Sequence, residues 1–124
     1  MLEFLKCKHC GQIIKKIKDT GVPVICCGEK MELITPNTTD ASNEKHVPVV
    51  AVDGQLVTVT VGSVEHPMVK EHFIEWVILE TNLGSYKMIL KPDDKPVATF
   101  NLRKGEVVLH SYAYCNLHGL WMNK

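Results

Sequence analysis

The sequence predicts an all-β protein, an antiparallel β-sandwich preceded by a small cysteine-rich module. Three observations support this prediction. Four of the five cysteines lie within the first 27 residues. From residue 46 onward, several short segments alternate apolar and polar residues with period two, and turn-forming residues separate them. No segment of this larger part shows a helical period, so several short strands at this spacing predict a sandwich.

The composition limits the classes of protein to consider. A chain of 124 residues makes one ordinary domain, or one domain with an appendage, and 45% apolar residues allow a buried core. The 14 basic and 14 acidic residues cancel, so the charge gives no reason to expect binding to nucleic acid. No apolar run reaches the roughly 18 residues of a membrane span, and "MLEFLKCKHC" does not resemble a signal peptide. We expect no membrane association and a cytoplasmic location, where clustered thiols are more often metal ligands or redox groups than disulfides.

The first part of the chain, residues 1–36, holds the cysteine-rich module. Its apolar residues are few, and pieces under about 40 residues usually need a metal, disulfides or a partner subunit to fold. The polar stretch "TPNTTDASNEK", from Thr35 to Lys45, follows it and is typical of a linker. We therefore predict two domains, residues 1–36 and residues 37–124.

The larger part begins with two strands, "VPVVAV" and "QLVTVTVG", which the Asp-Gly pair of "VDGQ" joins as a hairpin. In the second strand the valines point one way and the threonines the other, as in a half-buried strand. The next strand, "FIEWVILET", is expected to present Ile74, Trp76 and Ile78 on one face. Further strands are predicted at "SYKMIL", "VATF" and "EVVLHSYAY", with a turn at "KPDDKP".

The amino-terminal cysteines form two pairs, "CKHC" and, fifteen residues later, "CC". The four candidate ligands are Cys7, Cys10, Cys26 and Cys27. Four thiolates can surround one tetrahedral ion, zinc or a single iron, and the metal would then supply folding energy that the small core lacks. The two adjacent cysteines fit zinc modules poorly, because those usually separate the ligands of a pair by two to four residues. Free or disulfide-bonded cysteines are the alternative, and His9 is expected to be exposed.

The larger part contains a second group of candidate ligands, most of them at the ends of predicted elements, where a rigid scaffold aims loops at a shared site. The group consists of His46, His66, His72, Cys115 and His118. Pro67 keeps His66 in an extended segment. His110 lies inside a predicted strand and is interpreted as a structural residue.

Four imidazoles and one thiolate limit the choice of metal. Zinc generally takes four ligands, and blue-copper sites use two histidines and one cysteine. Iron accepts five protein donors and keeps a sixth position for a small ligand, towards which a thiolate pushes electron density, as in thiolate-ligated haem. These residues therefore predict a redox site for a small oxygen species.

The motifs closely resemble those of desulfoferrodoxin, the two-iron superoxide reductase family. "CKHC…CC" resembles its desulforedoxin-type iron–tetrathiolate module, and the motifs around its catalytic iron resemble "EKHVPV", "GSVEHPM", "EHFIEW" and "YCNLHGLW". The resemblance covers essentially the whole chain. It implies an immunoglobulin-like β-sandwich for residues 37–124 and a desulforedoxin-like module for residues 1–36.

The resemblance also implies a role for each residue. The four histidines, His46, His66, His72 and His118, would be equatorial ligands, and Cys115 would be the axial thiolate. Glu44 and Lys45 match the family's mobile carboxylate and the lysine beside the open face.

The function implied is the one-electron reduction of superoxide to hydrogen peroxide, without release of oxygen, in the detoxification of superoxide. The implied cofactors are two non-haem irons per chain, with zinc as the alternative in the tetrathiolate centre. A rubredoxin-like protein would donate electrons, and a homodimer is expected.

Two other classes of function stay open on the residues alone. One is a non-catalytic metalloprotein with a zinc module and an interaction domain, which would be colourless. The other is a one-electron carrier, which would need a coordinatively saturated iron and would not bind azide or cyanide.

Overall fold

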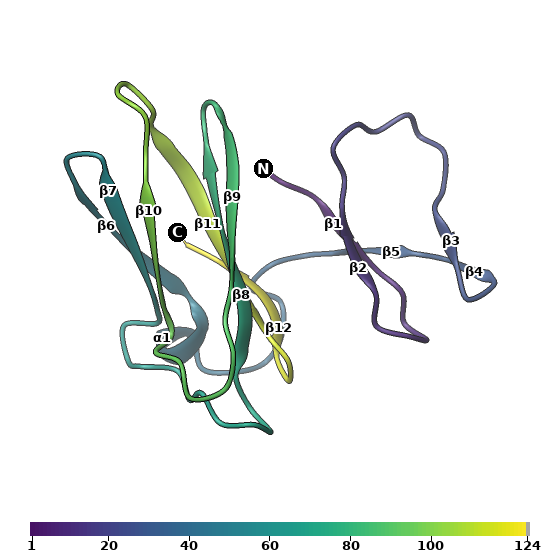
Figure 1. Cartoon of the computed structure of the whole chain (residues 1–124). Coiled ribbons are helices and arrows are strands. Elements are labelled where there is room, and N and C mark those ends of the chain that lie inside the picture. The colour runs from purple at the N-terminus through teal and green to yellow at the C-terminus, as the bar shows by residue number, and fades with distance from the viewer. Residues whose placement is uncertain (124) are drawn as a thin grey trace. The chain divides into compact units, whose positions relative to one another are not determined.

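The computed structural model describes residues 1–123 and is built almost entirely of antiparallel strands (Figure 1). The chain forms two compact units, Met1–Thr35 and the part from Pro36 onward. The predicted fold class, an antiparallel β-sandwich preceded by a small cysteine module, is confirmed. Within the described part of the chain, no helix has the length and apolarity needed to cross a bilayer.

The first unit contains a three-stranded sheet and a separate small hairpin. The sheet has the order β2-β1-β5, with β1 at Phe4–Lys6, β2 at Ile13–Lys15 and β5 at Glu32–Ile34. The hairpin pairs β3 (Ile25–Cys26) with β4 (Glu29–Lys30).

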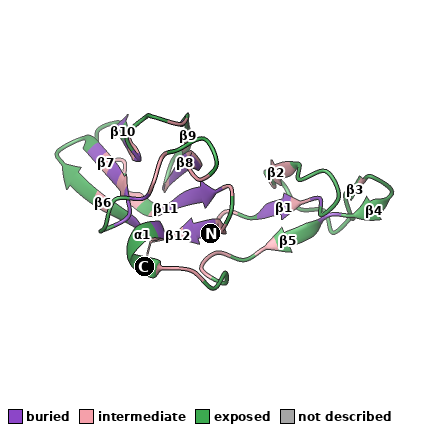
Figure 2. Ribbon diagram, turned by 90° about the horizontal axis from the view of Figure 1, so that it is seen from below, coloured by how far each residue is buried: buried purple, intermediate pink, exposed green. Residues whose placement is uncertain are grey.

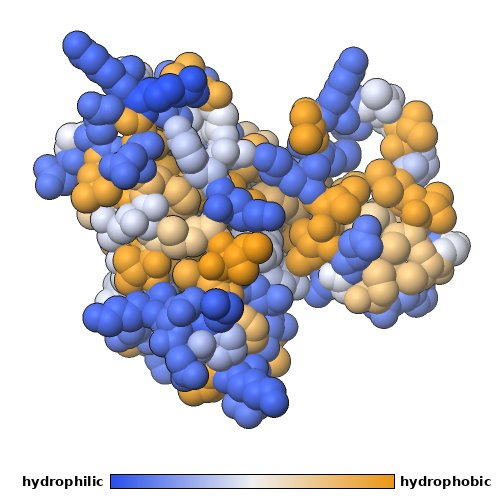
Figure 3. Space-filling model, viewed as in Figure 1, coloured by the Kyte–Doolittle hydropathy of each residue, from blue (hydrophilic) through white to orange (hydrophobic). Residues whose placement is uncertain are grey.

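The core of the first unit is very small. Its buried cluster consists of Leu5, Cys7 and Met31, and Phe4 is buried as well, whereas Ile17 is 93% exposed and Val22 is 72% exposed. Figure 3 shows hydrophobic side chains at the surface of this unit. So little burial stabilises a fold weakly, because the hydrophobic contribution scales with the apolar area removed from water.

The second unit contains the two sheets of the sandwich. One has the order β10-β7-β6 and the other β12-β11-β8-β9. The bounds in the first sheet are β6 Pro48–Asp53, β7 Leu56–Val61 and β10 Val97–Asn101. Those in the second are β8 Ile74–Thr81, β9 Gly84–Ile89, β11 Val108–Cys115 and β12 Gly119–Met122.

The core of the second unit lies between the two sheets. Val57, Val59 and Val61 of β7 have no exposed surface, as the period-two pattern predicted, and they belong to one cluster with Ala113 and Cys115 of β11. Figure 2 shows the buried positions on β7, β8 and β11. Because Cys115 ends β11 inside this cluster, its side chain is held within the buried core of the unit.

The face predicted for β8 is wrong at Ile74, whereas Trp76 and Ile78 share a face as predicted. Val77 and Leu79 belong to the core cluster together with Ile74, whereas Trp76 is half-buried and stacks on Tyr114 with ring centroids 5.4 Å apart. The cause is an irregularity in the pairing with β11, where Cys115 lies opposite Ile74 and Tyr114 opposite Trp76. One step along β11 therefore corresponds to two steps along β8. As a result, Ile74 lies on the opposite face of the strand from Trp76.

Two further elements differ from the sequence-based expectation. The predicted linker contains a one-turn helix, α1 (Asn43–His46). The segment after Cys115, where no strand was predicted, returns as β12 and pairs with β11 from Cys115↔Gly119 to Tyr112↔Met122. Both elements carry or flank residues of the second candidate centre.

Candidate metal centres

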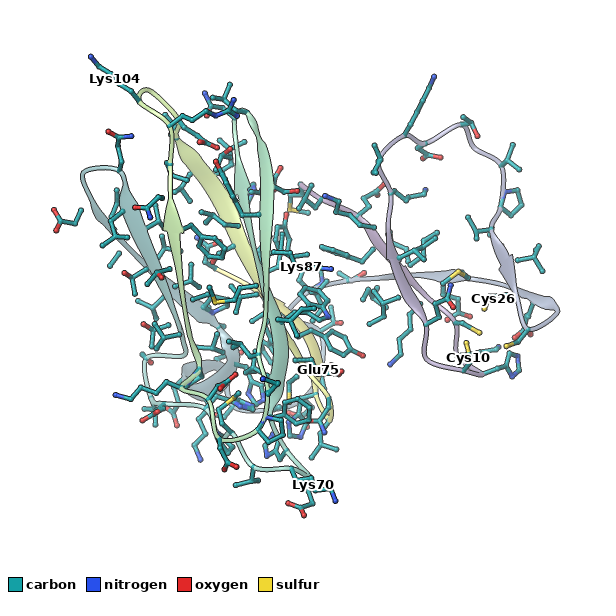
Figure 4. All side chains as sticks on the ribbon, viewed as in Figure 1. Cys10, Cys26, Lys70, Glu75, Lys87 and Lys104 are labelled. Carbon is teal, nitrogen blue, oxygen red and sulfur yellow. The ribbon has the colours of Figure 1, made fainter. Side chains whose placement is uncertain are left out.

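The structure brings the four amino-terminal thiols together. The sulfur atoms of Cys7, Cys10, Cys26 and Cys27 all lie within 4.8 Å of one another. The Cys10 and Cys26 sulfurs are 3.7 Å apart and face each other in Figure 4. Four sulfurs at this spacing match the donor set of a tetrahedral zinc or iron ion.

The turn between β3 and β4 explains how adjacent cysteines can share one centre. Its two central residues, Cys27 and Gly28, have φ angles of 52° and 75°. Positive φ at both central residues is the pattern of a type I′ hairpin turn, in which Cys26 still pairs with Glu29. Cys27 therefore adopts a left-handed conformation that costs a non-glycine residue about 1 kcal/mol.

The electrostatics of this cluster favour a bound cation. The amide of Cys10 is the largest of the influences that lower the pKa of Cys7 to about 6. Interactions with the neighbouring thiols, chiefly Cys7, raise the pKa of Cys26 to about 12. Repulsion between neighbouring thiolates thus opposes their joint deprotonation, and a positive ion among them would relieve it. His9 is exposed, as expected, and its Nε2 lies 2.6 Å from Glu29 Oε2.

The structure also brings together all five candidate ligands of the larger part. His46 ends α1, His66 and His72 lie between β7 and β8, Cys115 ends β11, and His118 precedes β12. The donor atoms of His46, His66, His72 and Cys115 lie within 4.8 Å of one another. His118 Nδ1 lies 3.2 Å from His46 Nε2 and 3.8 Å from Cys115 Sγ.

The four imidazole rings form a square. Neighbouring pairs in the order His46, His66, His72 and His118 have centroid separations of 4.6, 4.7, 5.1 and 4.9 Å, the last closing the square. Each of these pairs is close to perpendicular, with interplanar angles from 74° to 90°. The diagonal pair, His46 and His72, is 6.3 Å apart. Four nitrogens directed from a square of this size suit the equatorial plane of one metal ion.

The hydrogen bonds of the rings show that nitrogen lone pairs point into this square. Nδ1 of His46 donates to the Ser42 carbonyl at 2.7 Å, and Nδ1 of His66 donates to the Pro67 carbonyl at 2.7 Å. The neutral rings therefore present unprotonated Nε2 atoms, which lie only 3.2 Å apart. Nε2 of His72 is buried and has no partner. A metal ion would satisfy all three nitrogens, so the donor set fits the iron predicted from the sequence.

The surroundings keep the histidines in the neutral state that a metal requires, whereas the Cys115 thiol would lose its proton on binding the metal. Burial lowers the pKa of His66 to about 4, and burial is also the largest cause of the lowered pKa values of His46 and His72. Burial raises the pKa of Cys115, whereas the amides of Leu117 and His118 donate to its sulfur and lower that pKa in part. Both amides belong to the "CNLH" segment that begins at Cys115.

Trp121 contacts two of the candidate ligands and was not identified from the sequence. Its fully buried ring stacks on His46, with centroids 4.8 Å apart and an interplanar angle of 27°, and its Nε1 donates to the His118 carbonyl at 3.1 Å. The signal was present in the sequence, because Trp121 ends the same "YCNLHGLW" motif as Cys115.

Glu44 and Lys45 lie on α1 and are exposed. The charge of Lys45 contributes to the lowered pKa values of His46 and His72, so it acts on the centre. Among the described residues, no hydrogen bond joins the Glu44 carboxylate to the five donors. The Glu44 backbone carbonyl instead accepts from the amide of Val64 at 2.9 Å.

His110 lies outside both centres, as interpreted from the sequence. Its Nδ1 is 3.1 Å from Glu80 Oε1, which also accepts from the Tyr112 hydroxyl at 2.8 Å. This group ties β8 to β11 and has a structural role.

Comparison with known proteins identifies the family. The desulfoferrodoxin family profile matches residues 38–124. The desulfoferrodoxin of Nitratidesulfovibrio vulgaris is 46% identical over 119 residues, which cover 96% of this chain and 93% of that protein. The desulfoferrodoxin of Syntrophotalea carbinolica is 44% identical over 123 residues, which cover 99% of this chain and 96% of that protein. The crystal structure of the superoxide reductase from Treponema pallidum is 40% identical, covers 100% of this chain and 99% of that one, and has a TM-score of 0.84. The chain therefore belongs to the desulfoferrodoxin family.

Proposed function

We propose that this protein is a superoxide reductase, which converts superoxide into hydrogen peroxide without releasing oxygen. The observation that carries this proposal is the convergence of four imidazoles and one buried thiol on one small region, with the Nε2 of His72 left without a partner. The likeness to superoxide reductase over the whole chain supports the same reaction.

The reaction takes one electron and two protons per superoxide and gives one hydrogen peroxide. Five residues would hold the iron, and the bound iron would supply the electron: His46, His66, His72, His118 and Cys115. The two ring hydrogen bonds to backbone carbonyls hold His46 and His66 in the tautomer that leaves Nε2 free to bind. The amides of Leu117 and His118 stabilise negative charge on the Cys115 sulfur.

Lys45 and Glu44 are proposed to act on the anionic substrate. Because superoxide carries a negative charge, the exposed ammonium of Lys45 raises its local concentration beside the centre and can order the water that delivers protons. Glu44, its neighbour on α1, is proposed as the mobile carboxylate that closes the centre after the product leaves.

The first unit is proposed to be a desulforedoxin-like iron–tetrathiolate module within residues 1–36, and residues 37–124 the catalytic domain. Iron is the proposed metal at Cys7, Cys10, Cys26 and Cys27, with zinc as the alternative.

We further propose a rubredoxin-like electron donor and a cytoplasmic location, where thiolate centres persist. A homodimer is proposed because a second copy could cover exposed apolar side chains of the first unit, such as Ile17 and Val22.

The experiment that tests this function is rapid mixing of the reduced, iron-loaded protein with a measured amount of superoxide. We expect one hydrogen peroxide for each superoxide consumed and no oxygen. Oxygen at half the amount of superoxide would show dismutation instead. A one-electron carrier would leave the rate of superoxide loss unchanged, and azide would not alter its absorption spectrum.

A further inference from the structure

Asn116 joins the loop of Cys115 to the segment that carries His72. Its side-chain Oδ1 accepts from the Phe73 amide at 3.0 Å, and its own amide donates to the Phe73 carbonyl at 3.2 Å. Its side-chain Nδ2 donates to the Glu71 carbonyl at 3.0 Å. These three bonds bracket His72 on both sides along the chain.

His72 depends on these backbone bonds more than His46 and His66 do. The rings of His46 and His66 are each fixed by an Nδ1 bond to a backbone carbonyl. Among the described residues, no such bond fixes the ring of His72, and its buried Nε2 has no partner. The direction of this ring is therefore set by the backbone that carries it.

That backbone is a tight local turn. The amide and carbonyl of Val69 exchange two bonds of 3.0 Å with the carbonyl and amide of His72. This bridge fixes the shape of the turn but not its position relative to Cys115. The three bonds of Asn116 fix that position, because Asn116 directly follows Cys115 in the chain.

We propose that Asn116 is a positioning residue that sets the distance and direction of His72 relative to Cys115, and thereby the iron affinity of the five-donor centre. The inference rests on the proposed five-donor iron site and not on the reaction carried out there. Residues that orient a metal ligand through hydrogen bonds typically change metal affinity 10- to 100-fold when they are removed.

The chain contains a matched control for a merely structural role. Asn82, just after β8, makes the same pair of bonds with Val107: its Oδ1 accepts from the Val107 amide at 2.8 Å, and its amide donates to the Val107 carbonyl at 3.1 Å. It follows Thr81, at the end of β8 opposite to Ile74, and neighbours no candidate ligand. If Asn116 only stabilises the fold, Asn116→Ala and Asn82→Ala should behave alike.

The test measures Fe²⁺ binding to the full-length chain without oxygen, in competition with a coloured chelator. The iron-thiolate absorption is recorded after oxidation, and the tetrathiolate centre serves as an internal reference. We expect Asn116→Ala to weaken iron binding at the five-donor centre about tenfold or more and to shift its absorption, whereas Asn82→Ala leaves both unchanged. Equal affinity and an equal spectrum for Asn116→Ala and the unaltered chain would overturn the proposal.

A second variant covers the case in which Asn116→Ala does not fold. Asn116→Ser keeps a side-chain oxygen that can accept from the Phe73 amide, but has no amide group to reach Glu71. We expect an affinity between those of the unaltered chain and Asn116→Ala, and unaltered binding would again overturn the proposal. Superoxide turnover does not enter this test, so a chain that binds iron but does not reduce superoxide would refute the proposed function alone.

Discussion

Lys45 stands one residue before His46, and its charge reaches two rings of the larger centre. Because superoxide is an anion, we predict that Lys45→Ala slows its capture roughly tenfold at low ionic strength and flattens the dependence of the rate on salt. Rapid mixing with superoxide at several salt concentrations measures both effects. Lys104→Ala is the matched control. Lys70, two residues before His72, marks the end of the unit that holds the centre, and Lys104 lies at the opposite end (Figure 4). Equal rates for the two variants would contradict the role of Lys45.

Cys115 supplies the only sulfur of the larger centre among the described residues. We predict that Cys115→Ser abolishes the thiolate-to-iron absorption of this centre, because a serine hydroxyl has no comparable charge-transfer transition. The spectrum of the oxidised, iron-loaded protein is the measurement. Cys10→Ser is the control and should change only the absorption of the first unit. Survival of the band in Cys115→Ser would mean that another residue provides the sulfur ligand.

At the scale of elements, the position of α1 depends on Gly62. A side-chain carbon added at Gly62 would lie 2.5 Å from the Glu44 carbonyl oxygen and 2.9 Å from the Lys45 carbonyl carbon, both of them backbone atoms. The helix that carries His46 would therefore have to move. We predict that Gly62→Ala destabilises the fold by about 1–3 kcal/mol and weakens iron binding at the larger centre.

Gly54 provides the control for the effect of Gly62. It lies in the turn between β6 and β7 with a φ angle of 60°, and an added carbon would meet nothing within 4 Å. Gly54→Ala should cost about 1 kcal/mol through backbone strain and leave iron binding unchanged. Chemical denaturation and iron titration of both variants are the measurements, and unchanged iron binding in Gly62→Ala would contradict the positioning of α1.

Glu106 joins the strands at the other end of the sandwich. Its carboxylate, which has no exposed surface, accepts from the Thr81 hydroxyl at 2.5 Å and the Tyr86 hydroxyl at 2.7 Å, and these bonds lower its pKa to about 2. A carboxylate with a lowered folded-state pKa stabilises the fold above its ordinary pKa near 4.5, and this stabilisation is lost as the pH falls towards 2.

We therefore predict that Glu106→Gln lowers the free energy of unfolding at pH 6 and makes it less dependent on pH between about 4.5 and 2. Denaturant unfolding at a series of pH values measures this, with both proteins loaded with iron so that loss of metal in acid affects them alike. If the free energies of unfolding of the two proteins changed with pH in parallel, the lowered pKa of Glu106 would be contradicted.

The sequence predicted some elements and not others for identifiable reasons. The buried valines of β7 were predicted because a strand with one buried face repeats with period two. The face on which Ile74 lies was not predicted. The alternation of faces along β8 is interrupted between Trp76 and Ile74 by the pairing with β11, which is distant in sequence. The four residues of α1 are too few to show a helical period.

The candidate ligands were predictable as a set because of their chemistry and their positions at element ends. Their square arrangement was not, since it depends on how β7, β8 and β11 pack together. The contact of Trp121 with His46 was missed for the same reason.

At the scale of the whole molecule, the two units differ in what holds them together. The second has a continuous core between two sheets, whereas the first buries only a few side chains around its cysteines. We predict that Cys10→Ser or a strong chelator unfolds residues 1–35 and leaves the sandwich folded, because a small metal domain draws its folding energy from the ion. Amide hydrogen exchange followed residue by residue measures this. Protection in both units after complete loss of the first metal would contradict it.

The most direct measurement is the number of iron and zinc ions per chain, on protein prepared without oxygen from an iron-replete culture. Two irons and negligible zinc are predicted, one iron at the four thiols and one at the square of histidines. One iron with one zinc would agree with a superoxide reductase in which the zinc at the four thiols has only a structural role. Zinc alone, with no iron retained or taken up, would contradict a superoxide reductase.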